Sequence, residues 1–266
     1  MRIALGIEYD GADFCGWQSQ PSGCGVQDHV ESALKTFLAA PATTIAVTCA
    51  GRTDAGVHAS SQVIHFDCAI ERDEVSWVRG VNTYLPPTIR ILWSRQVADD
   101  FHARFSARSR SYRYLLLNDS VDAAIMRGQV GWFHLPLNAT AMREAAATLV
   151  GEHDFSAFRA AECQARTAVK ILHEANVESN GRLFMFSFRA NAFLHHMIRN
   201  FVGGLVYVGA GRHSVDEFRT IFESRDRTLA APTFAAAGLY LANIEYDEKF
   251  GLPATRRRLL FPDGLG

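Results

Sequence analysis

The chain has 266 residues, a formal net charge of -1, 48% hydrophobic residues and 21% charged residues. This composition is typical of one large or two small globular domains and excludes disordered, collagen-like and disulfide-scaffold proteins. A globally basic nucleic-acid-binding protein is excluded as well, so any site for a polyanion must be a local patch.

The cysteines and the apolar segments bear on the cellular compartment. The five cysteines include no C-x-x-C pair, so we expect reduced core thiols rather than a disulfide framework or a zinc ribbon. The amino terminus is charged at Arg2, Glu8 and Asp10 and lacks the apolar region of a signal peptide. The longest apolar stretch, Phe201 to Gly211, falls short of the roughly 20 residues that span a bilayer. We therefore expect a cytoplasmic protein.

Hydrophobic periodicity predicts the elements of the first half. Residues 2–9 alternate between apolar and polar and predict a strand, and apolar residues spaced by three and four predict a helix over 26–38. Further strands are predicted over 45–49 and 62–68. A glycine-bounded loop, Gly51 to Gly56, lies between them.

The second half repeats this alternation of strands and helices. Asn138 is a predicted cap, Asn180-Gly181 a predicted hairpin turn, and Ser214 to Glu217 a predicted capping box that opens a helix. The predicted strands are 112–117, 171–177, 184–188 and 239–246, and the predicted longer helices are 139–150 and 192–207.

Neighbouring strands joined by a hairpin favour an α+β fold with mostly antiparallel sheets over a parallel doubly wound sheet. A polar stretch near residues 100–111 predicts the boundary between two halves, residues 1–105 and residues 106–266.

The loop Gly51 to His58 carries the densest chemical signal. Its glycines permit a tight turn that would hold the Asp54 carboxylate rigidly while another molecule approaches the backbone. An ordinary turn in which Asp54 accepts backbone hydrogen bonds remains the alternative. An aspartic-protease loop is disfavoured, because Thr53 precedes the aspartate instead of following it.

The stretch His102 to Tyr114 contains four Arg, three aromatic residues and no acidic residue. Arg can bind phosphate while an aromatic face stacks on an unpaired base, so the stretch predicts a nucleic-acid surface. A solvated basic linker followed by a strand is the alternative.

The stretch Asn191 to Asn200 opens an otherwise apolar predicted helix. His195 and Arg199 are four residues apart and should share a face, where the Arg would need a carboxylate partner. A metal site at His195-His196 is disfavoured, because neighbouring helical residues diverge and no H-E-x-x-H spacing is present. No P-loop, G-x-S-x-G elbow or G-x-G-x-x-G motif follows a strand.

Seven blocks in chain order resemble the signature blocks of the bacterial TruA family of tRNA pseudouridine synthases. They are Tyr9-Asp10-Gly11, Phe14 to Gln18, Gly51 to His58, Phe101 to Ser106, Tyr112-Arg113-Tyr114, His195 to Asn200 and Gly238-Leu239-Tyr240. The resemblance implies the pseudouridine synthase fold, with sheets of two halves joined into one extended sheet flanked by helices and an active-site cleft between the halves. It also implies isomerisation of uridine at positions 38, 39 and 40 of the tRNA anticodon arm by a homodimer without metal or organic cofactor.

Residue by residue, the resemblance implies that Asp54 is the catalytic aspartate, Tyr112 the active-site tyrosine and Arg199 the partner of the aspartate. Leu239 is the implied apolar pocket residue and Arg52 the residue that displaces the base. From the basic stretch itself we add Arg108 and Arg110 as expected phosphate contacts.

The chemistry of the implied reaction suits a carboxylate, since it is redox-neutral and a nucleophile in a shaped pocket can suffice. Attack at C6, attack at C1′ and elimination through a glycal all remain open. The rival functions are a non-catalytic tRNA-binding or folding protein, which has no use for a rigid Asp54, and a metal-dependent RNA hydrolase, for which no ligand cluster is evident.

Overall fold

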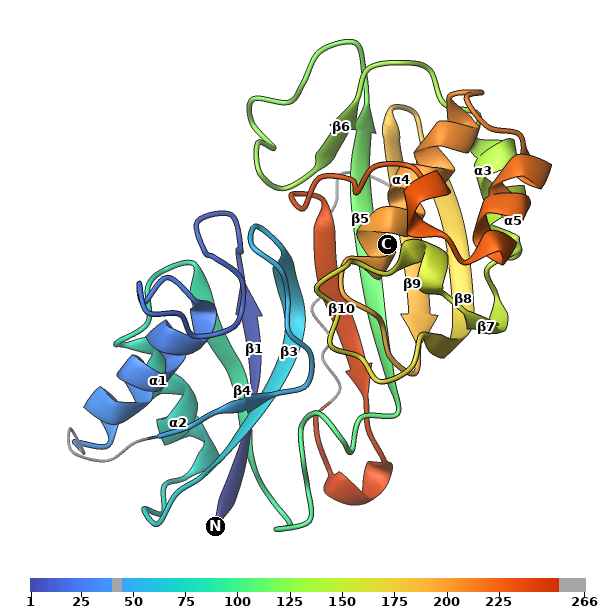
Figure 1. Ribbon diagram of the computed structural model, residues 1–266. Helices are drawn as coiled ribbons and strands as arrows, with labels where there is room; N and C mark the ends of the chain where they lie inside the picture. Colours follow the sequence, from blue (N-terminus) through green and yellow to red (C-terminus); the bar gives the residue numbers. More distant parts are fainter. Residues whose placement is uncertain (40–44, 254–266) are drawn as a thin grey trace. The chain divides into compact units, whose positions relative to one another are not determined.

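The computed structural model describes residues 1–39 and 45–253, which form two compact units (Figure 1). Among these residues, the first unit contains Met1–Arg108 and the chain from Tyr240 onward, and the second contains Ser109–Leu239. The expected division was residues 1–105 and residues 106–266, so the structure differs in assigning the last strand to the first unit.

The sheet of the first unit has the strand order β4-β1-β3-β10, with β2 paired to β3. Pairing is antiparallel except between β10 and β3, where Tyr240 lies opposite His58 in parallel register. The elements of this unit are β1 (Arg2–Tyr9), α1 (Val26–Phe37), β2 (Thr48–Cys49), β3 (His58–Asp67), α2 (Glu74–Asn82), β4 (Ile89–Val97), β10 (Leu239–Glu245) and the 3-10 turn η3 (Glu248–Phe250).

The core of the first unit forms where α1 and α2 pack against each other and α2 packs against β4. Trp77 on α2 is fully buried, and its ring lies 5.4 Å from that of Phe37 and 5.5 Å from that of Phe66. Val30 and Leu34 on the apolar face of α1 are also buried. The apolar residues spaced by three and four therefore face the core, as the sequence predicts.

The sheet of the second unit has the order β5-β9-β8-β7, with β6 parallel to the other side of β5. The elements are β5 (Ser109–Asn118), β6 (Gly131–Phe133), α3 (Ala139–Ala147), β7 (Gly151–Asp154), η1 (Ser156–Phe158), β8 (Val169–Asn180), β9 (Leu183–Ala190), α4 (Met197–Gly209), α5 (Val215–Ser224) and η2 (Arg227–Leu229).

An aromatic cluster joins α4, α5 and η1 in the second unit. The ring of Phe201 lies 4.9 Å from that of Phe158 and 5.5 Å from that of Phe155, and Phe222 stacks on Phe155 at 5.3 Å. Because these rings are buried, α4 is held on a rigid apolar base.

The α+β fold with mostly antiparallel pairing is confirmed, and so are several local predictions. Asn138 accepts from the Ala141 amide at 3.1 Å, Gly181 turns the β8–β9 hairpin with φ +59, and Ser214 forms the predicted capping box with Glu217. These features depend on neighbours in the sequence, which explains why they were predictable.

The predicted start of the helix near Ala192 is wrong. α4 begins at Met197, and His196 before it adopts a left-handed backbone with φ 60, which a helix cannot include. The Asn191 side chain accepts from the amides of Ile171 and Ala192 and so holds this segment as a turn. His195 therefore lies outside the helix and shares no helical face with Arg199.

The prediction that all five thiols are reduced is also wrong. Cys15 and Cys24 form a disulfide with Cα atoms 5.4 Å apart, whereas Cys49, Cys68 and Cys163 are free. The bond closes a loop before α1, where the chain folds back on itself. The spacing of the two cysteines in the sequence does not reveal that they lie close together.

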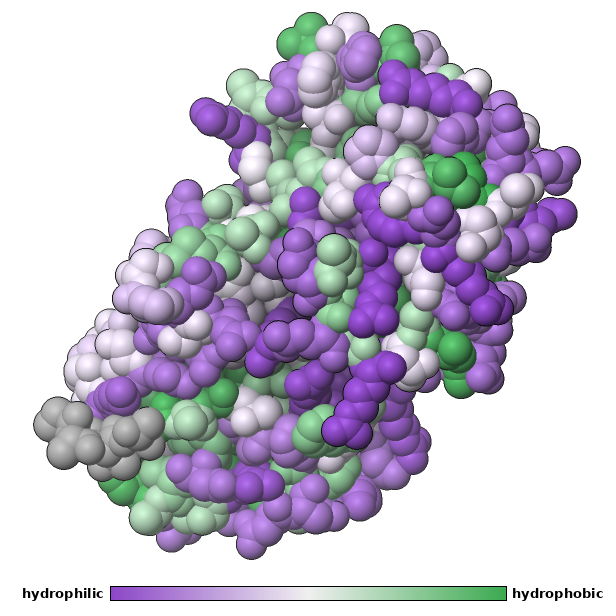
Figure 2. Space-filling model, viewed as in Figure 1, coloured by the Kyte–Doolittle hydropathy of each residue, from purple (hydrophilic) through white to green (hydrophobic). Residues whose placement is uncertain are grey.

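The visible surface mixes hydrophilic and hydrophobic residues (Figure 2). Among the described residues no helix has the length and apolar character needed to cross a membrane.

Candidate active site

Asp54 lies in the loop between β2 and β3, and the residue before it is fixed by a buried hydrogen bond. The Thr53 Oγ1 and the Tyr9 hydroxyl are 2.8 Å apart, and both side chains are buried. Tyr9 ends β1, so an interior strand of the sheet anchors the loop directly. Arg52, on the other side of Thr53, is exposed.

The residues after Asp54 form the tight turn that the glycine spacing predicts. The Val57 amide donates to the Asp54 carbonyl at 3.1 Å, and Gly56 adopts φ +75. A side chain at Gly56 would be strained in this conformation. The Asp54 backbone is therefore held from both sides.

The segment before α1 packs directly against this loop. The Trp17 amide donates to the Thr53 carbonyl at 3.0 Å, and the Gly56 amide donates to the Phe14 carbonyl at 3.3 Å. A Cβ on Gly16 would lie 2.7 Å from the Thr53 carbonyl oxygen, so only glycine permits this approach. The Cys15–Cys24 disulfide closes the same segment.

His58 fixes the end of the loop. Its Nδ1 accepts from the Gly11 amide at 3.0 Å, and its buried ring stacks on Tyr240 with 4.6 Å between centroids. Burial and the nearby Asp10 raise the pKa of the Tyr240 hydroxyl, which therefore stays protonated. His58 thus ties the loop to β10 of the same unit.

Tyr112, Arg199 and Leu239 belong to the second unit. Tyr112 is buried on β5, with its ring edge-on to Phe193 at 5.2 Å. Arg199 on α4 donates from Nε to the Phe234 carbonyl at 2.8 Å, and the Phe234 amide returns a bond to the Arg199 carbonyl at 3.2 Å. This reciprocal contact ties α4 to the segment that ends at the buried Leu239.

The buried Tyr114 lies in the same region of the second unit. Its hydroxyl donates to the Ala235 carbonyl at 3.0 Å, and burial raises its pKa although the Arg199 charge opposes the shift. Tyr114 therefore serves as a neutral support for the segment before Leu239. The structure brings Arg199 and this segment together within one unit, while the pairing of Asp54 with Arg199 stays a prediction.

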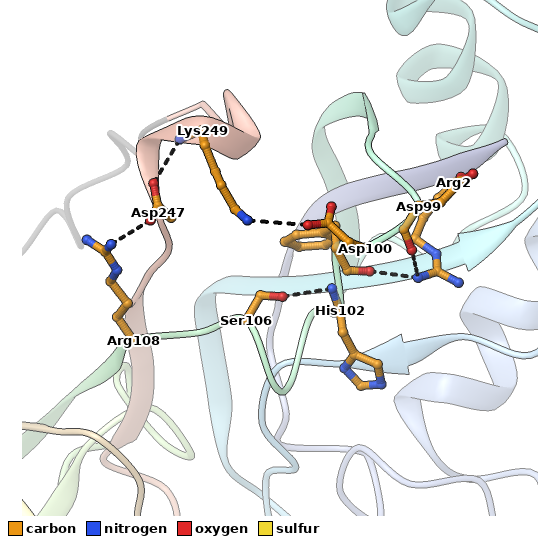
Figure 3. A network of polar contacts seen from close by, with 9 residues as sticks. Arg2, Asp99, Asp100, His102, Ser106, Arg108, Asp247 and Lys249 are labelled. Carbon is orange, nitrogen blue, oxygen red and sulfur yellow. Dashed lines mark hydrogen bonds and ion pairs between the residues drawn. The ribbon is translucent and has the colours of Figure 1, made fainter.

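Contacts within the first unit hold the residues just before the basic stretch and Arg108 within it (Figure 3). Arg2 donates to the carbonyls of Asp99 and Phe101, and Arg108 pairs with Asp247 at 2.5 Å. The predicted phosphate contact Arg108 therefore has an internal partner, although its side chain is 65% exposed. Arg110, in the second unit, donates to the Asn191 carbonyl at 2.9 Å.

Of the three aromatic residues in this stretch, two are buried. Tyr112 and Tyr114 face the interior, whereas Phe105 is 77% exposed. Phe105 and the Tyr9–Thr53 pair belong to the seven blocks, but no role was predicted for them from the sequence. For Phe105 the available signal was its position between Arg104 and Ser106, since a large apolar residue is unusual in a polar turn.

Most of the sequence matches a known protein family. The family described as tRNA pseudouridine synthase matches residues 6–106 and 145–247. A protein of Methylobacillus flagellatus named tRNA pseudouridine synthase A is 54% identical over 97% of this chain and 98% of its own length. A protein of the same name from Thiobacillus denitrificans is 53% identical over 98% of this chain and 99% of its own length.

Among solved structures, a chain titled "Crystal Structure of a Cbf5-Nop10-Gar1 Complex" matches with a TM-score of 0.32 and 14% identity, covering 86% of this chain and 60% of that one. The family assignment rests on the sequence matches, which span the Asp54 loop, β5 to β10 and nearly the whole chain. The resemblance of the seven blocks is thereby confirmed, and this chain belongs to the tRNA pseudouridine synthase family.

Proposed function

We propose that the chain converts uridine to pseudouridine in the anticodon arm of tRNA, at positions 38, 39 and 40, with Asp54 as the nucleophile. The family makes the chain an isomerase that acts on tRNA. The anticodon arm and the role of Asp54 rest on the resemblance of the loop Gly51 to His58 and its neighbouring blocks.

The observation that carries the proposal is the fixed backbone around Asp54. Thr53 is held by the Tyr9 hydroxyl and by the Trp17 amide, and the turn closes at the Val57 amide. A nucleophile held in one geometry reacts faster than a mobile one, because the cost of orientation is met during folding. A loop that only connects two strands has no need of these contacts.

The reaction moves one bond and conserves all atoms. The C1′–N1 bond breaks, the C1′–C5 bond forms, C5 loses its proton and N1 gains one. Asp54 adds to C6 or to C1′, or promotes elimination of the 2′ proton to give a glycal. A deuterium label at C2′ separates the last route, because only elimination breaks that C–H bond in the reaction.

The remaining roles follow the resemblance. Arg52 displaces the target base from its stack, a step that costs a few kcal/mol. Tyr112 contacts the extruded uracil, and Leu239 supplies an apolar contact. Arg199 orients the Asp54 carboxylate, because an ion pair with the guanidinium favours the charged form of the carboxylate. The rigid hold on the Arg199 backbone by Phe234 supports such an orienting role.

Arg108 and Arg110 are proposed phosphate contacts. Each already has an internal partner, Asp247 for Arg108 and the Asn191 carbonyl for Arg110, so binding would exchange these contacts for phosphate oxygens. Affinity should then fall by about 0.7–0.9 log units per phosphate contact for each log unit of salt. Replacing both Arg residues by Gln should flatten this slope.

We also propose a cytoplasmic homodimer that needs neither metal nor organic cofactor. The dimer and the absence of a metal or organic cofactor follow the resemblance. Sedimentation of the free protein tests the dimer, and turnover in the presence of a chelator tests the absence of a metal requirement.

The decisive experiment measures pseudouridine in unmodified tRNA after incubation with the protein in chelator. The wild-type chain and the surface control Asp13→Asn should form pseudouridine without cleaving the strand. Asp54→Asn should bind tRNA with the same affinity and form no product, because an amide keeps the size but loses nucleophilicity. Turnover by Asp54→Asn removes Asp54 from the mechanism, and binding without product in the wild type supports a tRNA-binding protein instead.

A further inference from the structure

Phe105 exposes a large apolar ring on the surface of the first unit. Its side chain is 77% exposed, whereas the nearby Phe101 is fully buried. Single exposed apolar residues are common on protein surfaces, so exposure alone indicates no function. What distinguishes Phe105 is how firmly the protein holds it.

The ring of His102 supports one face of Phe105, with 4.3 Å between centroids and 31° between planes. The His102 Nδ1 accepts from the amides of both Arg104 and Phe105 at 3.2 Å. Ser106 closes the turn, because its amide donates to the His102 carbonyl at 2.8 Å and its Oγ accepts from the His102 amide at 2.9 Å (Figure 3). Four hydrogen bonds therefore fix a turn of five residues.

His102 is itself supported from the sheet. Its ring lies 4.8 Å from that of His65 on β3, and the buried His65 Nδ1 accepts from the Ala103 amide at 3.2 Å. Burial lowers the pKa of both imidazoles, so each is neutral at pH 7. The Phe105 ring thus lies against the His102 ring, which in turn contacts the His65 ring on β3.

This turn lies near the Asp54 loop within the first unit. Thr48 on β2 pairs with His65 on β3. The next residue, Cys49, lies close to Arg52 in the chain. Burial raises the pKa of the Cys49 thiol to about 12, while the charges of Arg52 and of Arg104 both oppose this rise. Because Thr48 lies opposite His65 and the His65 ring contacts that of His102, the turn packs against the strand pair that leads into the Asp54 loop.

An exposed aromatic ring beside a guanidinium indicates the chemical class of the ligand. The Arg104 Cζ lies 5.6 Å from the centroid of the Phe105 ring. A flat aromatic face stacks on any base, and a neighbouring guanidinium binds phosphate. A helix or strand of a protein partner would need a wider apolar surface than one ring.

We propose that Phe105, supported by His102, is a stacking platform for an unpaired base of the tRNA anticodon loop, with Arg104 bound to the phosphate of the same nucleotide. This inference rests on the proposed function. Because the protein holds the ring rigidly before binding, stacking costs little additional ordering. The platform would retain the loop while the target uridine leaves its stack.

The test compares Phe105→Trp, Phe105→Leu and wild type, with Val75→Ala as a matched control at another exposed apolar position of the unit. We measure the Kd for unmodified tRNA, the single-turnover rate and the thermal midpoint. Phe105→Leu should raise Kd about 5- to 100-fold, the range expected for the loss of one stacked base. Phe105→Trp should bind at least as well as wild type, and Val75→Ala should match wild type.

Two further measurements separate stacking from general apolar contact. A tRNA carrying 2-aminopurine in the anticodon loop should lose fluorescence on binding wild type and retain it with Phe105→Leu. Arg104→Gln should reduce the salt slope of Kd by about 0.7–0.9.

The outcomes distinguish this inference from the proposed function. If wild type forms pseudouridine but Phe105→Leu binds tRNA equally well, the platform is wrong and the function stands. If Phe105→Leu changes only the sedimentation of the protein, the ring contacts a protein and the RNA platform is again wrong. If wild type binds tRNA and makes no pseudouridine, the proposed function fails, while the Phe105 series still reports on stacking.

Discussion

The Tyr9 hydroxyl and the Thr53 Oγ1 lie 2.8 Å apart, where β1 meets the loop that carries Asp54. Both residues are buried, at 4% and 7% exposure. One hydrogen bond thus connects an interior strand of the first unit to the residue next to the proposed nucleophile.

We expect Thr53→Val to lose about 1–3 kcal/mol of stability and to lower the single-turnover rate, because the Tyr9 hydroxyl loses this partner in a buried place. Thr53→Ser keeps the hydroxyl and should restore most of the rate. A cycle with Tyr9→Phe should give a coupling energy of about 0.5–3 kcal/mol in thermal or denaturant unfolding. Additive effects of the two substitutions would show that the bond contributes nothing.

Arg199→Leu should lower the single-turnover rate by about 100-fold or more and leave the Kd for tRNA nearly unchanged, because Asp54 would lose its orienting charge. The substitution also removes the Nε bond to the Phe234 carbonyl. Arg199→Lys, which keeps a charge, serves as the comparison and should retain part of the rate. Weaker binding with an unchanged rate would make Arg199 a phosphate contact.

Tyr112→Phe tests whether the hydroxyl takes part in the chemistry. The Phe ring keeps the edge contact with Phe193, so folding and tRNA binding should not change. If the hydroxyl moves the proton that leaves C5, as we expect, the single-turnover rate should drop by about 100-fold. Tyr112→Leu should impair both binding and rate, and a fully active Phe variant would leave Tyr112 as a stacking residue.

His65 makes the protein less stable as the pH falls. Burial, with help from Arg2 and His102, lowers its pKa from 6.5 to about 4, while Asp67 opposes the shift. Between pH 6.5 and pH 4 the unfolded chain binds a proton that the folded chain does not bind, so acid favours unfolding by up to about 3 kcal/mol. Above pH 6.5 both states are neutral at His65 and its effect vanishes.

Thermal midpoints from pH 7 to pH 4.5 check this expectation. His65→Gln should show a shallower decline than wild type, and the exposed His173→Gln in the second unit should follow wild type. Parallel curves for all three proteins would contradict the assignment.

The thiol count tests the disulfide. The unfolded protein should react with three equivalents of thiol reagent before reduction and five after it, because Cys15 and Cys24 are bonded. Cys24→Ser should lower stability by about 2–3 kcal/mol in buffer without reductant, from the entropy of the closed loop. In reducing buffer the variant and wild type should agree, and five reactive thiols before reduction would contradict the bond.

Features that depend on near neighbours were accessible from the sequence. The period of β1, the apolar face of α1, the caps at Asn138 and Ser214 and the turn at Gly181 were all predicted at their observed places. Between residues 69 and 99 no element was predicted, yet α2 and β4 lie there. Gly80 and Asn82 in α2 and the mixed polarity of β4 obscure the periods of these two elements. The residues of the Asp54 loop were accessible too, through their order and through the family resemblance.

Contacts between distant segments were decided only by the tertiary structure. β10 follows the second unit in sequence, yet Tyr240 pairs with His58 of the first. Tyr114 and Phe105 are both aromatic residues of one basic stretch, yet one is buried against Ala235 and the other stands exposed on His102. The local pattern specifies which residues are apolar. Which of these residues become buried depends on packing between segments far apart in the chain, and that packing leaves Phe105 exposed.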